Sequence, residues 1–186
     1  AASLTHVYVG GWDDRIYAIN KEDQSIDWFY RTNGDIIARP AASADHVYVS
    51  SIDGNNFCLQ GIKGNVVWPF KTDRKLTADP LLNEKANLLY LPSDDYSLYV
   101  VGTLDGRLEW KHETGGKLTR QPVSVGSNVY SFSEIENFRE TQIIKTPTLY
   151  AYERQGRVFN KTQHKVLWKR DGATQYLADG ITDTYV

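Results

Sequence analysis

"HVYVGGWDDRIYAIN" (residues 6–20) and "HVYVSSIDGNNFCLQ" (residues 46–60) are two versions of one pattern, 40 residues apart. In each, two short apolar runs flank a turn that contains Asp. Alternation with a period of two residues is typical of half-buried β-strands, and Asp followed by Gly or Asp favours the positive φ of a tight hairpin. The pattern therefore predicts a β-hairpin that the chain contains more than once.

The same pattern continues through the chain at a spacing of about 40 residues. Three series of aromatic residues recur at equivalent positions: Tyr8, Tyr48, Tyr90 and Tyr130; Tyr17, Phe57, Tyr99 and Tyr150; and Trp28, Trp68, Trp110 and Trp168. A proline follows each of the first three tryptophans by twelve residues, and Gly180 takes that place in the fourth unit. We therefore treat residues 1–186 as a single repeat region with the units 1–40, 41–80, 81–122 and 123–186.

Each unit is predicted to contain four short antiparallel strands, which makes the chain all-β. The first two strands of a unit flank the turns Asp13-Asp14, Asp53-Gly54 and Asp94-Asp95, and stretches such as residues 36–43 and 77–84 read as the strand that opens the next unit. Four short strands in about 40 residues are typical of a β-propeller blade. Because a lone blade leaves both faces exposed, we expect blades to stack and the tryptophans, in third or fourth strands, to be core residues.

Composition narrows the range of partners. The net charge of -2 offers no basic surface for nucleic acid, and no apolar run approaches the length of a membrane span. No stretch of residues 1–186 has the pattern of a signal peptide, and a chain without Met that begins at Ala1 is expected to lack its native start. Cys58 is the only cysteine, so we expect a buried small hydrophobic residue rather than a disulfide, zinc or haem ligand.

The stretch "VYVGGWDDRIYAINKEDQSIDWFYRTNGDIIARPA" (residues 7–41) resembles the pyrroloquinoline-quinone-type propeller repeat. The resemblance covers almost the whole chain and is weakest in the fourth unit, where residues 135–147 are inserted. Propellers of this family usually have about six to eight blades. The resemblance therefore implies a partial propeller whose missing blades belong to the rest of a longer parent chain. The alternatives are a partner that completes the propeller and a closed four-bladed ring.

Function follows from this resemblance only as an expectation. The repeat occurs in outer-membrane assembly lipoproteins of the BamB type, in quinoprotein dehydrogenases and in sensor ectodomains. The leading hypothesis is a non-catalytic propeller that serves as a binding or assembly platform in the periplasm or cell exterior, with a protein partner that the sequence does not identify. The alternatives are a fragment of a quinone-dependent dehydrogenase and a sensor ectodomain.

The dehydrogenase alternative is the weaker one because its usual residues have no counterpart here. Enzymes of that type hold pyrroloquinoline quinone with calcium, use an Asp as general base, and often carry a vicinal Cys pair. Cys58 has no cysteine neighbour, and no set of Glu, Asn and Asp aligns with the calcium ligands. We therefore expect no cofactor, with pyrroloquinoline quinone and calcium only under the alternative.

Other catalytic or metal-binding patterns are also missing from the sequence. It contains no GxSxG, HExxH or GxxxxGK[ST] motif, so no catalytic residue is assigned. His6 and His46 share one repeat position and therefore do not suggest a metal pair. His112 and His164 lie beside the tryptophan strands, where we expect them to be exposed, and turn chemistry accounts for the acidic residues without a metal.

One series of polar residues is a candidate ligand site. It occupies the position eleven residues after each tryptophan, in the strand expected to lie next to the propeller axis: Arg39, Asp79, Gln121 and Asp179. Polar side chains there are predicted to ring the mouth of the channel, where propellers commonly bind ligands. Solvated channel walls or ion pairs between blades are the alternative interpretation.

Two insertions, residues 133–147 and 154–165, interrupt the fourth unit and are predicted to be loops at the rim. Loops on a rigid scaffold often carry binding residues. The first insertion combines charged and apolar residues, of which the candidate partner-binding residues are Phe138, Arg139, Ile143 and Ile144. A loop without a partner is the alternative.

Overall fold

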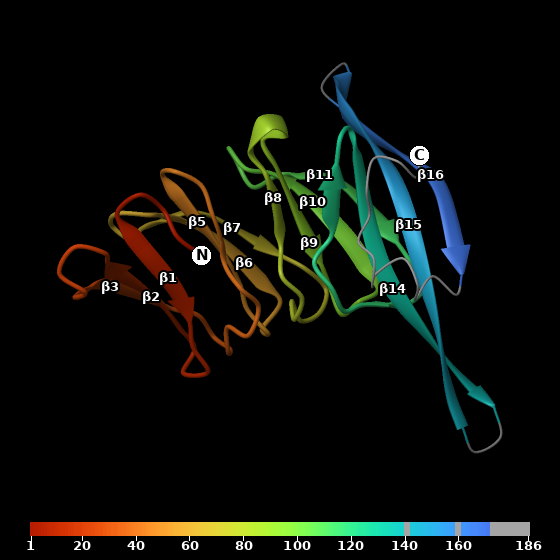
Figure 1. The fold of residues 1–186 in the computed structure, drawn as a ribbon, viewed down its shortest axis with the longest axis horizontal. Helices are drawn as coiled ribbons and strands as arrows, with labels where there is room; N and C mark the ends of the chain where they lie inside the picture. Colours follow the sequence, from red (N-terminus) through yellow and green to blue (C-terminus); the bar gives the residue numbers. More distant parts are fainter. Residues whose placement is uncertain (140–141, 159–160, 172–186) are drawn as a thin grey trace.

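The structure is a computed structural model that describes residues 1–139, 142–158 and 161–171. It is a row of twisted antiparallel sheets, one from each sequence unit, that stack side by side along the chain (Figure 1). The prediction of an all-β propeller with four-stranded blades is therefore confirmed. Asp179 and Gly180 lie outside the described residues.

The first two sheets have nearly the same construction. The first sheet contains β1 (His6–Gly10), β2 (Arg15–Asn20) and β3 (Ile26–Arg31). The second contains β4 (Ala41–Ala42), β5 (His46–Ser50), β6 (Asn55–Gln60) and β7 (Val66–Lys71). An isolated bridge between Ala2 and Val7 corresponds to the pairing of Ala42 with Val47, so the first unit keeps the register of its missing opening strand.

The third and fourth sheets continue the row. The third contains β8 (Leu81–Asn83), β9 (Leu88–Pro92), β10 (Ser97–Gly102) and β11 (Leu108–Glu113), with the short 3₁₀ helix η1 (Glu84–Ala86). The fourth contains β12 (Lys117–Leu118), β13 (Val123–Val125), β14 (Asn128–Arg139), β15 (Gln142–Val158) and β16 (Lys161–Asp171). The opening strands β4, β8 and β13 contact one another in turn, so they converge on one side of the row.

Two local predictions need correction. The opening strands begin only after Pro40 and Pro80, and are shorter than residues 36–43 and 77–84, because proline has no N–H to donate to a ladder. In the third unit, the left-handed turn residue is Tyr96 (φ 69°), which takes the place of Asp14 (64°) and Gly54 (85°). The turn pair there is Asp95-Tyr96, one residue later than expected.

A row of three side chains crosses each sheet and explains the aromatic repeat. Tyr48 in β5 pairs with Cys58 in β6, which pairs with Trp68 in β7. Tyr48 and Trp68 approach to 5.9 Å between ring centroids over the small, fully buried Cys58. The matching rows are Tyr8–Ala18–Trp28 and Tyr90–Val100–Trp110. Cys58 is therefore the small hydrophobic residue that was predicted, and burial raises the pKa of its thiol to about 12.

The core lies between the sheets, in one cluster per junction. Leu89, Leu91 and Val101 face the second sheet, whereas Leu88, Leu98 and Val100 face the fourth. Successive residues of a strand point to opposite faces, so a strand covered on both faces is apolar throughout, as β9 is. Trp68 and Trp110 are buried in these clusters, and Trp28 is partly buried against the cluster between the first and second sheets. The prediction that the tryptophans are core residues is therefore confirmed for these three, whereas the side chain of Trp168 lies outside the described part of the structure.

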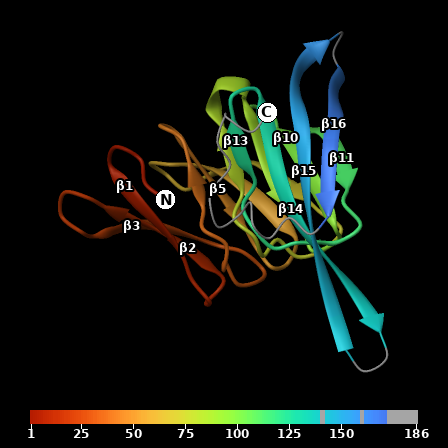
Figure 2. The same ribbon diagram turned by 45° about the vertical axis from the view of Figure 1, so that its right-hand side comes forward.

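The two insertions are strands, not loops. Pairing of β14 with β15 continues without a break from Asn128↔Glu153 to Arg139↔Gln142. Pairing of β15 with β16 extends to Val158↔Lys161. The part of the β14–β15 hairpin beyond Glu134 and Pro147, which we call the ribbon, projects well past the sheets (Figures 1 and 2). Its sequence is rich in Ile, Phe and Thr, which favour strands, and this preference extends the hairpin.

Candidate functional site

Three segments lie between the last strand of one sheet and the opening strand of the next: residues 32–40, 72–80 and 114–122, the last of which includes β12. Arg39, Asp79 and Gln121 each precede the proline that ends such a connection. Because the opening strands converge, these three predicted residues come from successive sheets to one side of the molecule. The fourth member of the series, Asp179, lies outside the described residues.

Arg39 and Asp79 form a two-point contact between connections that are 40 residues apart. The backbone N–H of Arg39 donates to Oδ1 of Asp79 at 2.7 Å, and the Nε–H of Arg39 donates to Oδ2 at 2.6 Å. The carboxylate thus uses both oxygens on one residue, a geometry that holds the guanidinium in place. The Arg39 side chain is nonetheless 78% exposed, whereas that of Asp79 is 21% exposed.

Gln121 extends this contact to the fourth sheet. Its Nε2–H donates to the carbonyl oxygen of Pro80 at 2.7 Å. Proline carbonyls are ordinary acceptors, so this bond fixes the amide orientation and leaves the Gln121 Oε1 as an acceptor. Gln121 and the Arg39–Asp79 pair together tie three connections to one another.

A cavity of about 390 Å³ lies against these residues, which we call the connection pocket. Its wall includes Arg39, Asp79, Arg120, Gln121, Tyr130 and Phe132. The guanidinium of Arg120 lies 5.5 Å from the centre of the Phe132 ring. Arg39, Asp79 and Gln121 therefore lie around one cavity, and Arg39 and Asp79 form an ion pair between blades, whereas ligand binding by this series stays a prediction.

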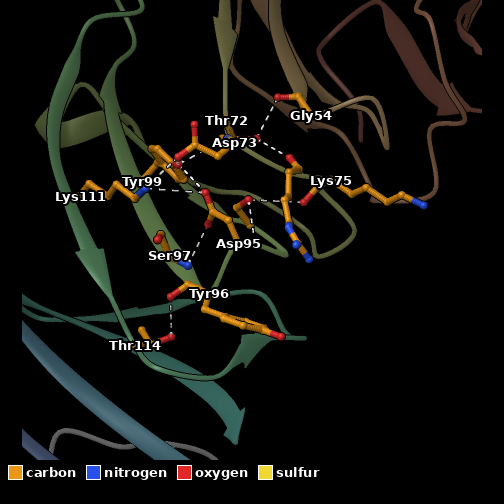
Figure 3. A network of polar contacts seen from close by, with 12 residues as sticks. Gly54, Thr72, Asp73, Lys75, Asp95, Tyr96, Ser97, Tyr99, Lys111 and Thr114 are labelled. Carbon is orange, nitrogen blue, oxygen red and sulfur yellow. Dashed lines mark hydrogen bonds and ion pairs between the residues drawn. The ribbon is translucent and has the colours of Figure 1, made fainter. Parts of the chain in front are cut away.

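A polar network between the second and third sheets was not foreseen from the sequence (Figure 3). The Tyr99 hydroxyl donates to Asp73 at 2.9 Å and also contacts Asp95. Lys111 donates to Asp73 at 3.0 Å, and its Nζ lies 4.7 Å from the centre of the Tyr99 ring. The i, i+4 spacing of Asp95 and Tyr99 recurs in Asp13 and Tyr17, which also bond, and this spacing was the available signal.

The network changes the titration of its members. The hydrogen bond from Lys111 holds the pKa of Asp73 below its ordinary value. Burial, assisted by the bond to Asp95, raises the pKa of Tyr99 to about 12. The hydrogen bond to Tyr99 is the main reason that the pKa of Lys111 is raised. Asp73 and Lys111 are therefore both charged near neutral pH. The contacts that Asp73 makes with Tyr99 and Lys111 link the end of the second sheet to the third.

One threonine per unit closes the end of each sheet. The Thr72 hydroxyl contacts the carbonyl oxygens of Gly54 and Arg74 at 2.9 and 2.7 Å. Thr32 and Thr114 make the same pair of contacts in the first and third units, and Figure 3 includes the bond from Thr114 to Tyr96. This repeated bond fixes where each connecting segment leaves its sheet, and so positions the pocket residues.

The predicted partner-binding residues all lie in the ribbon. Its register pairs Phe138 with Ile143 and Asn137 with Ile144, and Arg139 pairs with Gln142 at the end. β12 pairs with β14 only as far as Glu134. Among the described residues, no further strand pairs with either edge of the ribbon, which is therefore two strands wide.

The histidines differ in part from expectation. The Nε2 of His6 lies 2.7 Å from Asp27, and the His6 side chain is buried, whereas His46 is half-buried. His112 was expected to be exposed, but it packs against the rings of Tyr150 and Tyr152 at 5.5 and 5.2 Å. In the described part of the chain, no three His, Cys, Asp or Glu side chains are grouped as metal ligands.

No helix among the described residues is long and apolar enough to cross a membrane.

Comparison with known proteins identifies the repeat. A family model described as outer membrane protein assembly factor BamB matches residues 1–183. No curated protein matches the chain. Among solved structures, BamB from Moraxella catarrhalis is 17% identical with a TM-score of 0.64, over 89% of this chain and 61% of that one. The chain thus spans less than two thirds of that relative.

Two other solved structures share the fold. The quinohemoprotein alcohol dehydrogenase from Comamonas testosteroni is 13% identical with a TM-score of 0.66, over 89% of this chain and 33% of that one. The computationally designed Ika4 protein is 16% identical with a TM-score of 0.64, over 71% of this chain and 81% of that one. At such identities the likeness shows a common propeller fold and nothing about activity.

Proposed function

This chain belongs to the family of the outer membrane protein assembly factor BamB, and we propose that it is a non-catalytic propeller that serves as a platform for protein binding or assembly outside the cytoplasm. The match of the family model to residues 1–183 carries the proposal. The packing between the sheets supports this proposal. Apolar clusters cover both faces of the third sheet, and such a rigid scaffold holds its strand edges and turns in fixed positions for a partner.

The ribbon is the binding element that we propose for this platform. From Ile135↔Thr146 to Arg139↔Gln142 its two strands pair only with each other among the described residues. Unpaired strand edges offer backbone N–H and C=O groups that an extended partner segment can complete. The sequence of the ribbon includes Phe138, Ile143 and Ile144, which we propose as the apolar residues of this binding element, and Arg139 as a charged one.

The edge of β14 is the more suitable of the two edges. On β15 the ribbon contains Lys145 and ends at Pro147, and both residue types discourage the addition of a strand. Residues 135–139 of β14 contain no proline. We therefore expect a partner strand beside β14, beyond the point where β12 ends.

The test is to replace residues 135–146 with Asn-Gly in the full-length protein. Glu134 and Pro147 are register partners, so a two-residue turn can join them without changing the sheet. The proposal predicts an unchanged unfolding midpoint and the loss of at least one partner that co-purifies with the unaltered protein. A matched control, Glu136→Gln with Lys145→Gln, keeps the ribbon and the net charge and should keep the partner.

Three readouts distinguish the possible outcomes. A photo-crosslinking residue at position 137 should give a discrete adduct in cells, and one at position 29, in the exposed strand β3, should not give the same adduct. If the shortened variant keeps every partner, and position 137 gives no adduct, the ribbon is not the binding element. Quinone-dependent alcohol oxidation by the purified protein would favour the dehydrogenase candidate instead.

A further inference from the structure

The connection pocket combines two guanidinium groups with an apolar floor. Arg39 and Arg120 reach it from different connections, and Asp79 is the acidic residue in its wall, so its ionisable side chains sum to +1 (two Arg and one Asp). Tyr130 and Phe132 in the floor are each only 4% exposed. We infer that this pocket binds a carboxylate carried on a hydrophobic group, either a small organic acid or the C-terminal carboxylate of a peptide that ends in an apolar residue.

Asp79 orients Arg39 without using the whole guanidinium. Both oxygens of Asp79 are occupied by the backbone N–H and the Nε–H of Arg39. Among the described residues, the two Nη atoms of Arg39 have no hydrogen-bond partner. These two atoms form the edge of the guanidinium that can bind a carboxylate through two parallel hydrogen bonds. The site therefore holds a donor pair in a fixed orientation before the ligand arrives.

Arg120 provides the second cation beside an aromatic surface. Its guanidinium lies 5.5 Å from the centre of the Phe132 ring, which attracts the cation and places it at the border between the polar wall and the apolar floor. An arginine held on a ring keeps its planar N–H donors available to an anion. A ligand with a charged end and a hydrophobic body matches this pocket, because its charged end can lie at the polar wall and its body on the apolar floor.

The charge of the pocket favours a monoanion over a phosphate. Asp79 is an acidic residue in the wall, and a carboxylate there opposes a dianion more strongly than a monoanion. The hydroxyls of Thr77 and Ser131 donate to Asp94 and Tyr152, at 2.7 and 3.2 Å, so the hydroxyl of Thr119 is the one that we expect to donate to a carboxylate. A cavity of about 390 Å³ lies near the lower end of the range for small-molecule sites, roughly 300–1,000 Å³, so it suits one short acid or one terminal residue.

The first experiment measures ligand class by calorimetry and by backbone-amide NMR at low salt. The probe 3-phenylpropionate should bind with a Kd on the order of 1 mM or below and shift the backbone amides of residues 77–79, 119–121, 123 and 130–132. Its amide, 3-phenylpropanamide, and phenyl phosphate should each bind at least about tenfold more weakly. Acetyl-Gly-Gly-Phe with a free C-terminus should compete if the natural ligand is a peptide, and will not compete if the pocket takes only small acids.

The second experiment assigns the binding to the two arginines. Arg39→Gln and Arg120→Gln should each lower the affinity for 3-phenylpropionate by about tenfold or more. The matched control is Arg107→Gln, because Arg107 is an exposed arginine, paired with Asp105 at 3.5 Å, that does not line the pocket. The inference is wrong if no probe saturates, if the amide or phenyl phosphate binds as tightly as the acid, or if both pocket variants bind like the control. The variant with a shortened ribbon should keep this binding, so failure of the platform proposal leaves the result interpretable.

Discussion

Trp68 donates its indole Nε1–H to the carbonyl oxygen of Thr103 in the next sheet, at 2.9 Å. Trp28 makes the same bond one sheet earlier, to Gly61 at 3.0 Å. Each indole also packs against a glycine of that turn, Gly106 or Gly64, with φ of 68° and 70°. The repeated tryptophan therefore links neighbouring sheets through a hydrogen bond and is also a core residue.

Replacing Trp68 by Ala should destabilise the protein by about 3–5 kcal/mol, because it empties a buried site and removes the bond to Thr103. Equilibrium unfolding in urea measures this change. Trp12→Ala is the matched control, since Trp12 is 83% exposed, and it should change the free energy of unfolding by less than about 0.5 kcal/mol. If Trp68→Ala lowers the free energy of unfolding by less than about 1 kcal/mol, Trp68 does not link the two sheets in this way.

Gly106→Ala should be more destabilising than Gly115→Ala, although both residues have positive φ, at 68° and 72°. A Cβ on Gly106 would lie 2.6 Å from the Trp68 indole, whereas one on Gly115 meets no atom within 4 Å. The backbone cost, about 1–2 kcal/mol, is common to both, and the clash adds about 1–3 kcal/mol at Gly106. In a Trp68→Ala background the difference should shrink, and a difference that persists would mean that the indole is not its cause.

Asp73→Asn should lower stability at neutral pH by an amount that disappears in acid. The pKa of Asp73 is depressed in the folded protein, chiefly by the bond from Lys111. Its contribution is therefore fully present above its ordinary value of 3.8, and is lost as pH falls through the lower folded value. Urea unfolding of both proteins from pH 7 downwards measures this convergence. In a Lys111→Gln background most of the pH dependence should vanish, and unchanged dependence would exclude Lys111 as the cause.

Tyr99→Phe should cost on the order of 1–2 kcal/mol, because it leaves Asp73 and Asp95 without the hydroxyl that joins them. Tyr17→Phe, at the equivalent but only half-buried position, should cost less. Because the pKa of Tyr99 is raised from 10.0 to about 12 in the folded protein, this contribution is fully present below pH 10 and is lost as the pH rises through about 12. Ultraviolet titration of the unaltered protein and of Tyr99→Phe should assign the ionisation that the variant loses to about pH 12, and a lost ionisation near pH 10 would contradict the burial of Tyr99.

We expect no tight, calcium-dependent binding of pyrroloquinoline quinone. The chain has a single cysteine, Cys58, where enzymes of that type often carry a vicinal pair, and Cys58 is buried between Tyr48 and Trp68. Titration with the quinone and Ca²⁺, followed by absorbance and calorimetry, measures this binding. Stoichiometric binding in the sub-micromolar range would move the dehydrogenase candidate ahead of the platform.

The repeat made most of the fold predictable because strand pairing within a unit depends on local sequence. Alternation with a period of two places Tyr48, Cys58 and Trp68 in one row once the turns are set, and Asp53-Gly54 sets the turn. The same reasoning failed at Pro40 and at Tyr96. A pattern of apolar residues does not show where a proline removes the backbone N–H that strand pairing needs. It also does not show which turn residue adopts the left-handed backbone conformation.

The candidate site was only partly predictable. Its repeat position marked Arg39, Asp79 and Gln121 as equivalent residues, but equivalence does not show which of them touch. The angle and distance between stacked sheets decide that Asp79 reaches Arg39 while Gln121 reaches Pro80. Arg120 has no repeat signal at all, and only its position over Phe132 reveals it as a second cation of the pocket.

The amino-acid sequence by itself determined the period, the four strands of a blade and the buried aromatic rows, because these depend on residues near one another in the chain. Tertiary structure alone decided the Asp73–Tyr99–Lys111 network, the connection pocket and the ribbon. Asp73 and Lys111 are 38 residues apart and meet because neighbouring sheets stack at a fixed twist. The ribbon extends past the sheets because pairing between β14 and β15 continues in one register after contact with the neighbouring strands has ended.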